Sequence, residues 1–443
     1  MTDEQKSLQR EDIQGLVIRG YRMPLAAYVF YRFNGADLAR SWLGEMVDFV
    51  TTAAEWDEKP TWCANLGLTY VGLEALGLPA PFLLSFPEDF RQGMAARAAS
   101  RLGDVGADLP EHWEASPPFA SRGVHAVLLI SAREGELDVR VAAFEQASVA
   151  CGLERVGYQP AAALGPDHSS DREHFGFRDG ISQPAIRGSG LEDKEHADRL
   201  TVAPGEFVLG YPDELGNRPM PSPEPLGRNG TYGVYRKLQQ HVAVFRDYVQ
   251  SRDNGDLLAA KLMGRWPSGA PVALAQDADD LALAADPHRN NRFRYNEDPL
   301  GLACPRGAHV RRTQPRDDTA SSRRRLLLRR GLTYGEELPE DAPDDGTRGL
   351  VGLFLNASIE RQFEFVQRKW LNWGQFDGLS NDPDPITGPD GRDFTWQRRT
   401  GPRRYPSLPR FVTVCGGEYF FLPSITALRF LSDLSSFSRT ELT

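Results

Sequence analysis

The sequence predicts an α+β protein built from two domains. Segments with strand character and segments with helix character mix in both halves of the chain, without a strict alternation of one strand and one helix. The 443 residues exceed one ordinary core and suggest two units of about 200 residues each. Hydrophobic residues make up 40% of the chain and charged residues 25%, which are ordinary globular values, so each half can bury a core.

The chain begins with a polar lead, residues 1–11, that we expect to be disordered. Residues 26–33, AAYVFYRF, are rich in aromatic side chains and end at the turn signal Asn34-Gly35, which predicts a strand. Residues 36–50 predict an amphipathic helix, because apolar side chains recur on one face: Leu38, Trp42, Met46 and Phe49.

Two more elements complete the first half. Residues 125–132, HAVLLISA, form an apolar run of strand length. The segment after it is ambiguous, because LDVRV alternates as in a strand. The longer pattern favours a helix, since apolar side chains recur at helical spacing: Leu137, Val141, Phe144 and Ala147.

Glycine, proline and charged residues dominate residues 187–230, which indicates a linker or a long insertion. We therefore predict an N-terminal domain over residues 12–190, a linker or insertion over 191–230, and a C-terminal domain over 231–443. The chain shows no short internal repeat.

The second half is also predicted to be α+β. Residues 238–250 are predicted to be helical. Residues 358–370 predict an amphipathic helix, with Ser358 as the N-cap and Glu360 placed favourably in the first turn. Residues 409–423 predict two strands joined at Gly416-Gly417. The apolar face of the 358–370 helix is expected to hold Ile359, Phe363, Val366 and Trp370.

Charge and cysteine content limit the functional classes. The net charge of −10 and the pI near 5.4 disfavour nucleic-acid binding, which depends on Lys and Arg neutralising phosphates. The four cysteines show no CxxC spacing, so we expect reduced thiols in a cytoplasmic protein. The polar N-terminus lacks a secretory h-region, and no run approaches 18 apolar residues, so we expect no membrane association.

Three segments carry residues suited to chemistry. Residues 174–184, HFGFRDGISQP, hold Asp179 between glycines and aromatic residues; residues 304–316, CPRGAHVRRTQPR, contain His309; and residues 323–335, RRRLLLRRGLTYG, contain an arginine run. Each pattern also has an ordinary structural explanation: a turn aspartate, a hydrogen-bonded histidine or a solvated basic face. Spacing alone does not establish that Asp179, His309 and an arginine meet.

The same residues make the sequence resemble the dye-decolourising peroxidase family, haem enzymes with two ferredoxin-like domains. The resemblance rests on GFRDG around Asp179, on His309 in GAHVRR and on Arg329 before RGLTYG. Other segments match a longer, non-secreted branch of the family, and the likeness covers nearly the whole chain: GEFVLGYPDE, RNGTYGVYRKLQQ, GRWPSGAP and ERQFEFVQRKWLN.

The resemblance implies a cofactor and site roles. Haem b would lie between the helices and the sheet of the C-terminal half, with His309 as its iron ligand and Arg311 paired with a propionate. The second ring nitrogen of His309 would donate to a carboxylate or carbonyl, for which Glu360 is a candidate. Asp179 would act as the base and Arg329 as the charge stabiliser on the peroxide side.

The implied activity is reduction of hydrogen peroxide through an oxoferryl intermediate, with oxidation of organic electron donors such as dyes and phenols. Two other classes stay open: a haem-binding or haem-transfer protein, and a haem enzyme that inserts oxygen. Asp179 and Arg329 argue against storage alone, which needs only His309. In the family, a Leu-x-Phe pair lines the pocket. This chain has Leu350 and Gly352 at the matching positions, which predicts either a missing phenyl group and a roomier cavity or, if the match is shifted by two residues, a phenyl group supplied by Phe354.

Overall fold

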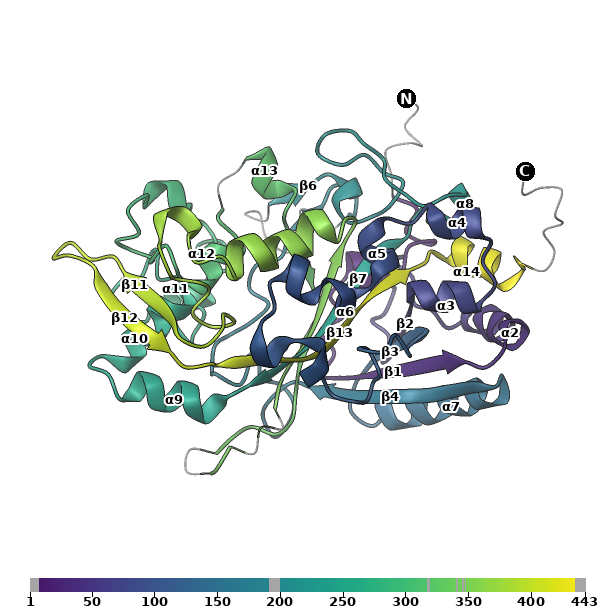
Figure 1. The fold of residues 1–443 in the computed structure, drawn as a ribbon, viewed down its shortest axis with the longest axis horizontal. Helices are drawn as coiled ribbons and strands as arrows, with labels where there is room; N and C mark the ends of the chain where they lie inside the picture. Colours follow the sequence, from purple (N-terminus) through teal and green to yellow (C-terminus); the bar gives the residue numbers. More distant parts are fainter. Residues whose placement is uncertain are drawn as a thin grey trace.

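The computed structural model describes residues 8–190, 200–316, 319–339, 342–344, 346 and 348–434. Its centre is one nine-stranded sheet with the order β4-β1-β3-β2-β13-β7-β10-β8, in which β9 also pairs with β10 (Figure 1). The strands of this sheet are β1 (Leu25–Phe33), β2 (Trp62–Leu68), β3 (Ala126–Ala132), β4 (Leu153–Ala162), β7 (Thr231–Gln240), β8 (Leu328–Arg329), β9 (Leu332–Tyr334), β10 (Gly349–Asn356) and β13 (Val412–Leu422).

Helices, one short parallel strand pair and one short hairpin surround the sheet. Two consecutive π-helical segments follow β10, at Glu360–Glu364 and Val366–Leu371. The short strand pairs outside the main sheet are β5 (Ala185–Ile186) with β6 (Thr201–Val202) and β11 (Arg392–Trp396) with β12 (Arg403–Leu408). The α-helices are α1 (Gly15–Ile18), α2 (Ala36–Met46), α3 (Tyr70–Ala75), α4 (Ala80–Leu84), α5 (Glu88–Gln92), α6 (Met94–Arg97), α7 (Leu137–Ala150), α8 (Glu224–Gly227), α9 (Val242–Gln250), α10 (Gly255–Met263), α11 (Leu281–Ala285), α12 (His309–Thr313), α13 (Ala320–Arg323) and α14 (Ile425–Ser432).

The sheet divides into two halves with the same topology. The first half runs β1-α2-β2-β3-α7-β4 and pairs in the order β4-β1-β3-β2. In the second half, β7, the β8–β9 pair, β10 and β13 repeat this order as β13-β7-β10-β8, with helical segments after β7 and after β10. Both halves therefore have the ferredoxin-like strand–helix–strand arrangement, which confirms the predicted fold class.

The two halves join edge to edge at β2 and β13, where Phe421 lies opposite Leu68. Figure 1 shows the first half, with α2, α3 and α7, at one end of the molecule. The other end carries α9 to α12 and the β11–β12 hairpin. The long connection between β7 and β8 supplies most of this second end, and it carries His309.

Several sequence predictions are confirmed. The strand predicted at residues 26–33 is β1, the strand at 125–132 is β3, and the ambiguous segment is helix α7. Ser358 Oγ accepts a hydrogen bond from the backbone N–H of Arg361 at 3.4 Å, as expected near a helix N-terminus. The helix over 358–370 is π-helical, and its Ile359, Phe363 and Val366 are buried as predicted.

Other predictions are wrong in detail. Residues 238–240 end strand β7, and helix α9 begins only at Val242. Residues 412–422 form one strand with a bulge after Val414 instead of two strands. Glycine is needed there for close approach, because a Cβ on Gly417 would lie 2.9 Å from the Tyr235 carbonyl oxygen.

The predicted face of helix α2 is also shifted. Leu38 and Phe49 are exposed, and the helix buries Ala39, Trp42, Leu43 and Met46. The expected disordered lead lies outside the described residues at 1–7. Leu8 is buried and the Gln9 amide donates to the Tyr211 hydroxyl at 3.2 Å, so the segment from residue 8 is packed.

The expected linker over 191–230 lies outside the described residues at 191–199. From residue 200 onward it is part of the packed fold, because Phe207, Val208 and Leu209 are buried in the main hydrophobic core. In the described ranges, no helix combines the length and apolar character needed to cross a membrane.

Candidate active site

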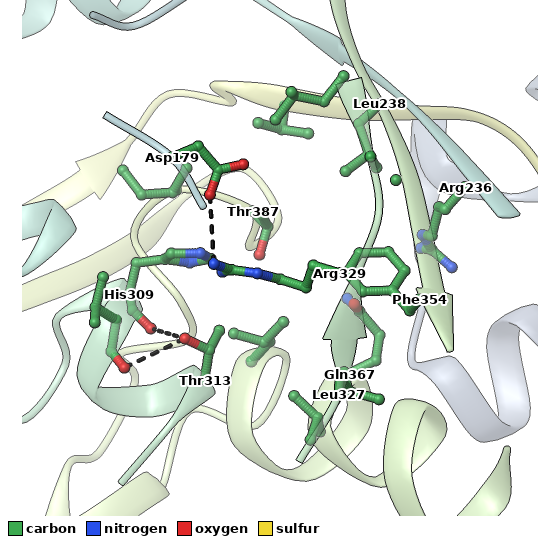
Figure 2. Close-up of a pocket in the computed structure, with 18 of the residues that line it drawn as sticks. Asp179, Arg236, Leu238, His309, Thr313, Leu327, Arg329, Phe354, Gln367 and Thr387 are labelled. Carbon is green, nitrogen blue, oxygen red and sulfur yellow. Dashed lines mark hydrogen bonds and ion pairs between the residues drawn. The ribbon is translucent and has the colours of Figure 1, made fainter. Parts of the chain in front are cut away.

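A cavity of about 290 Å³ opens on one face of the second half of the sheet. Its walls come from the loop over residues 173–184, from strands β7, β8 and β10, from helix α12 and from the π-helical segment after β10 (Figure 2). His309, Asp179 and Arg329 all line it. The structure thus brings together three residues that span 150 positions of the chain, from Asp179 to Arg329.

His309 is the first residue of helix α12 and its imidazole projects into the cavity (Figure 2). The Nδ1 atom lies 2.9 Å and 3.0 Å from the two carboxylate oxygens of Asp384. Thr313 Oγ1 donates to the His309 carbonyl at 3.0 Å and so closes the short helix. A carboxylate on Nδ1 fixes the ring orientation and directs Nε2 to the cavity as a metal ligand.

Asp384 is the partner that the sequence did not reveal. Its carboxylate is fully buried and also accepts hydrogen bonds from the Ile386 and Thr387 amides and the Thr387 hydroxyl. Burial alone would raise the pKa of Asp384, but the His309 imidazole and the Thr387 hydrogen bonds lower it to about 2. The expected partner, Glu360, is instead a mostly exposed residue 3.8 Å from Arg101.

Arg311 does not line the cavity, so the structure gives no support to its expected contact with a propionate. Its buried guanidinium donates to the Asp298 carboxylate at 3.2 Å and to the Cys304 carbonyl at 2.8 Å, and it stacks over Tyr295. The reason is helical geometry: residues two apart on a helix point to different sides, so a helix that turns His309 inward turns Arg311 away.

Asp179 lies on a sharply bent loop. Gly176 and Gly180 have φ angles of 91° and 73°, a region that side chains with a Cβ rarely adopt. Glu173 fixes the loop. Its buried carboxylate accepts hydrogen bonds from the Phe175 amide at 2.9 Å and from the Phe177 amide at 3.0 Å. Burial raises the pKa of this Glu173 carboxyl to about 7.

The aromatic neighbours of Asp179 anchor its loop. Phe175 and Phe177 pack on Phe245 of α9, with centroids 4.5 Å and 6.3 Å from the Phe245 ring. Both also line the cavity together with Asp179. His174 is buried with Nε2 2.9 Å from the Tyr334 carbonyl oxygen, outside the cavity lining, so it is structural.

Arg329 reaches across the cavity to Asp179 (Figure 2). Its guanidinium lies 3.4 Å from the Asp179 carboxylate and 3.4 Å from the Ser182 carbonyl oxygen. Strand β8 fixes the backbone, because Arg329 lies opposite Phe354 on β10 and its amide donates to the Gln183 side chain at 3.0 Å. A carboxylate and a cation therefore lie next to each other in the wall of the cavity.

The pocket face of β10 contains Leu350, Gly352 and Phe354, which alternate along the strand as residues on one face do. The Phe354 ring lies over Gly352, since a Cβ built there would be 2.6 Å from Phe354 Cε2. Phe354, two residues after Gly352, thus supplies a phenyl group at this place in the pocket. Of the two possibilities at this position, the structure favours the one in which Phe354 supplies the ring.

Other charged residues complete the cavity lining. Arg236 is paired with Asp104 at 2.5 Å, both buried. Arg178 is partly exposed beside Asp171, and Arg265 is buried and donates to the Gly269 and Asn290 carbonyls. Burial lowers the pKa of Arg265 to about 9, the direction expected for a cation that lacks a carboxylate partner.

No protein-family model matches the chain. A dye-decolorizing peroxidase of Exidia glandulosa is 30% identical over 451 residues, which cover 95% of this chain and 87% of that protein. Peroxidase 2 of Mycetinis scorodonius is 31% identical over 461 residues, with the same two coverages.

The chain belongs to the dye-decolorizing peroxidase family. This peroxidase has the same fold as a solved dye-decolorizing peroxidase in complex with 2,6-dimethoxyphenol, with a TM-score of 0.84 and 31% identity over 96% of this chain and 100% of that chain. A multifunctional dye peroxidase of an Amycolatopsis species is 31% identical over 409 residues, 83% of this chain and 82% of that protein. This peroxidase is therefore a haem-dependent oxidoreductase.

Proposed function

We propose that this peroxidase reduces hydrogen peroxide in the cavity between His309 and the Asp179–Arg329 pair, with haem b as its cofactor. The observation that carries the proposal is the placement of three groups around one cavity. They are an imidazole oriented by a buried carboxylate, an accessible carboxylate, and an arginine 3.4 Å from that carboxylate.

The residues present fit a haem group. Leucine, isoleucine and valine side chains make up much of the cavity lining, and a single histidine directs Nε2 into it. Arg178 and Arg265 are cations in the lining that suit propionate carboxylates. In the described residues, no three His, Cys, Asp or Glu side chains gather as a site for a bare metal ion.

When bound, haem b supplies the iron that receives the peroxide and the electrons that cleave its O–O bond. His309 would hold this iron, and Asp384 would keep Nδ1 protonated and the ring in place. Asp179 would take the proton from the nearer peroxide oxygen and deliver it to the departing one. Arg329 would stabilise the negative charge that develops on the peroxide and on the leaving oxygen.

Storage or transfer of haem is the second candidate function. The Asp179–Arg329 pair argues against it, because a carrier needs no base and cation opposite its ligand.

Oxygen insertion would use the same residues as peroxidation, so the two activities differ only in the fate of the donor. Product analysis with an 18O-labelled peroxide distinguishes them: a peroxidase leaves the label in water, whereas an oxygen-inserting enzyme leaves it in the organic product.

The test of the proposal is peroxide-dependent oxidation of 2,6-dimethoxyphenol by the haem-loaded protein. We expect His309→Ala to lose haem or bind it weakly, with loss of the turnover, because Nε2 of His309 is the proposed iron ligand. His288→Ala removes an exposed histidine and should leave the spectrum and the turnover unchanged. Full haem occupancy with an unchanged spectrum in His309→Ala would overturn the ligand assignment.

The four free cysteines, three of them buried, support a proposed cytoplasmic location, where thiols stay reduced. Fractionation of the producing cells tests this, and recovery of the protein outside the cytoplasm would contradict it.

A further inference from the structure

A second cavity, of about 500 Å³, lies against the same loop and strand as the first. Its walls come from residues 16–23, from strands β1 and β3, from the loop at 180–189 and from the β8–β9 segment. Gly180, Pro184, Arg329 and Gly331 line both cavities, so a thin wall of backbone separates them. The volume is typical of a site for a small organic molecule, for which about 300–1,000 Å³ is usual.

The charge of this second cavity is one-sided. Five cationic residues line it and no Asp or Glu does, within the described part of the chain, although the whole protein carries a net charge of −10. A concentration of one charge in a hollow focuses the field and favours ligands of the opposite charge. The five cations are Arg19, Arg22, Lys59, Arg329 and Arg330.

Two of these cations are poorly compensated. Arg19 makes no side-chain hydrogen bond or ion pair with any described residue, and its Nε is buried without a partner. Lys59 is exposed, and among the described residues it donates only to the Arg22 carbonyl oxygen, at 3.1 Å. Partial desolvation and the charge of Arg133 lower its pKa. Neither cation has a carboxylate partner among the described residues, and an anionic ligand would supply one.

Aromatic side chains give the same cavity a second property. Trp56 and Tyr21 both line it, with ring centroids 5.9 Å apart, and the Arg19 guanidinium lies 5.0 Å from the Trp56 centroid. Tyr21 is buried behind Trp56, so the half-buried indole would contact a flat ring while the Arg19 guanidinium over it binds an acidic group. Inorganic anions would use only the cations.

We propose that this second cavity binds an anionic aromatic electron donor, a phenol bearing a carboxylate. The inference rests on the proposed peroxidase function. The donor would lie on the far side of the Gly180–Arg329 wall from the peroxide. Each of two donor molecules loses one electron and its phenolic proton, and these two electrons and two protons convert one hydrogen peroxide into two molecules of water.

The test compares syringate with syringamide, its uncharged carboxamide, by calorimetric titration of the haem-loaded protein without peroxide. We expect syringate to bind about tenfold more tightly than syringamide, and the double variant Arg19→Gln/Lys59→Gln to lose this preference. The control Lys369→Gln/Arg399→Gln removes two exposed cations elsewhere and should keep it. Arg19→Lys, which retains the charge, serves if the double variant does not fold and should weaken syringate binding less than Arg19→Gln.

Three results would overturn the proposal. Equal affinities for syringate and syringamide, or an equal loss in the control variant, would exclude the cavity as the site. If inorganic phosphate binds as tightly as syringate, the cavity binds anions in general and does not recognise the aromatic ring. If binding holds but kcat/KM for syringate relative to 2,6-dimethoxyphenol does not fall in the double variant, the bound molecule is not a donor. Because the titration needs no turnover, it remains informative even if the protein lacks peroxidase activity.

Discussion

Asp179 and Arg329 lie side by side, but different features of the chain hold them. The aspartate depends on a loop that two glycines bend, and the arginine depends on the pairing of β8 with β10. Both side chains are partly exposed to the cavity, at 54% and 40%. A base and a cation can therefore both reach a ligand in the cavity without rearrangement of the backbone.

Replacing each member of this pair separates their roles. Arg329→Leu should slow oxidation of the resting enzyme by hydrogen peroxide by a factor of about 10²–10³, because a preorganised charge stabiliser is lost. Asp179→Asn keeps the shape but removes the base, with an expected loss of about 10²–10⁴. Stopped-flow absorption at the Soret band measures the step, and haem content should be unchanged in both variants.

Asp253→Asn is the control, because Asp253 is an exposed carboxylate that does not line the cavity. A mild effect of Asp179→Asn with a severe effect of Arg329→Leu would mean that the arginine organises a water molecule that carries the proton. If neither variant slows the step, the GFRDG segment is structural and the proposed mechanism is wrong.

Asp384 acts only through His309, so it is a positioning residue. Asp384→Asn keeps the size of the side chain but removes its charge, which should reduce the basicity of the imidazole. We expect a lower iron–histidine stretching frequency in the ferrous protein and a haem affinity reduced by about 10–100-fold. Resonance Raman spectroscopy and haem titration measure these two effects. Glu360→Gln, on the exposed residue first expected to be the partner, should change neither; an unchanged frequency in Asp384→Asn would contradict the assignment.

At the scale of single elements, β10 determines the shape of the cavity. Its alternation presents Leu350, Gly352 and Phe354 to the pocket, and the glycine leaves room for the phenyl ring of Phe354 to lie back over it. Phe354 in turn packs on Phe363 of the π-helical segment, with centroids 5.1 Å apart. One ring therefore fills a space that a side chain at position 352 would otherwise occupy.

Gly352→Phe should consequently overpack this face of β10. We expect it to lower the free energy of unfolding by about 1–3 kcal/mol, because the new ring and Phe354 compete for one space. The double variant Gly352→Phe/Phe354→Ala should recover most of this loss. Urea unfolding measures both. If the single and double variants have the same free energy of unfolding, the Phe354 ring can adopt another position.

At the scale of the whole molecule, buried ion pairs connect the two ferredoxin-like halves. Arg97, from helix α6, binds both carboxylate oxygens of Glu364 at 2.5 Å and 2.6 Å, and Tyr419 on β13 donates to the same carboxylate at 2.9 Å. Arg97 and Glu364 are both 3% exposed. Such a pair adds little net stability when intact, but loss of one partner leaves a buried charge uncompensated.

Glu364→Gln should therefore lower the free energy of unfolding by about 3–5 kcal/mol. Glu360→Gln is the control on the same helical segment, because its partner Arg101 is 3.8 Å away and both are exposed, so we expect an effect within about 1 kcal/mol. Urea unfolding of the two variants, monitored by tryptophan fluorescence, measures the difference. Equal stabilities would mean that water or another group compensates Arg97.

The sequence by itself determined the local elements and the residues that carry a motif. Period and composition are enough for β1, β3 and α7, because the backbone geometry of a strand or helix is set by neighbouring residues. The motifs around Asp179, His309 and Arg329 were likewise visible, since each is a short segment with its own turn residues. All three line one cavity in the structure.

Only the tertiary structure decided which side chains are partners. Asp384 lies 75 positions after His309, and nothing in its own segment marks it as the carboxylate on Nδ1. The direction of Arg311 depends on how α12 faces the cavity, and the space at Gly352 depends on where the ring of Phe354 lies, so the local sequence decided neither. Likewise, 412–422 is one strand because it pairs along its length with β7 and not with itself. Contacts between distant segments follow from how the two halves of the sheet bring them together, which local periodicity does not encode.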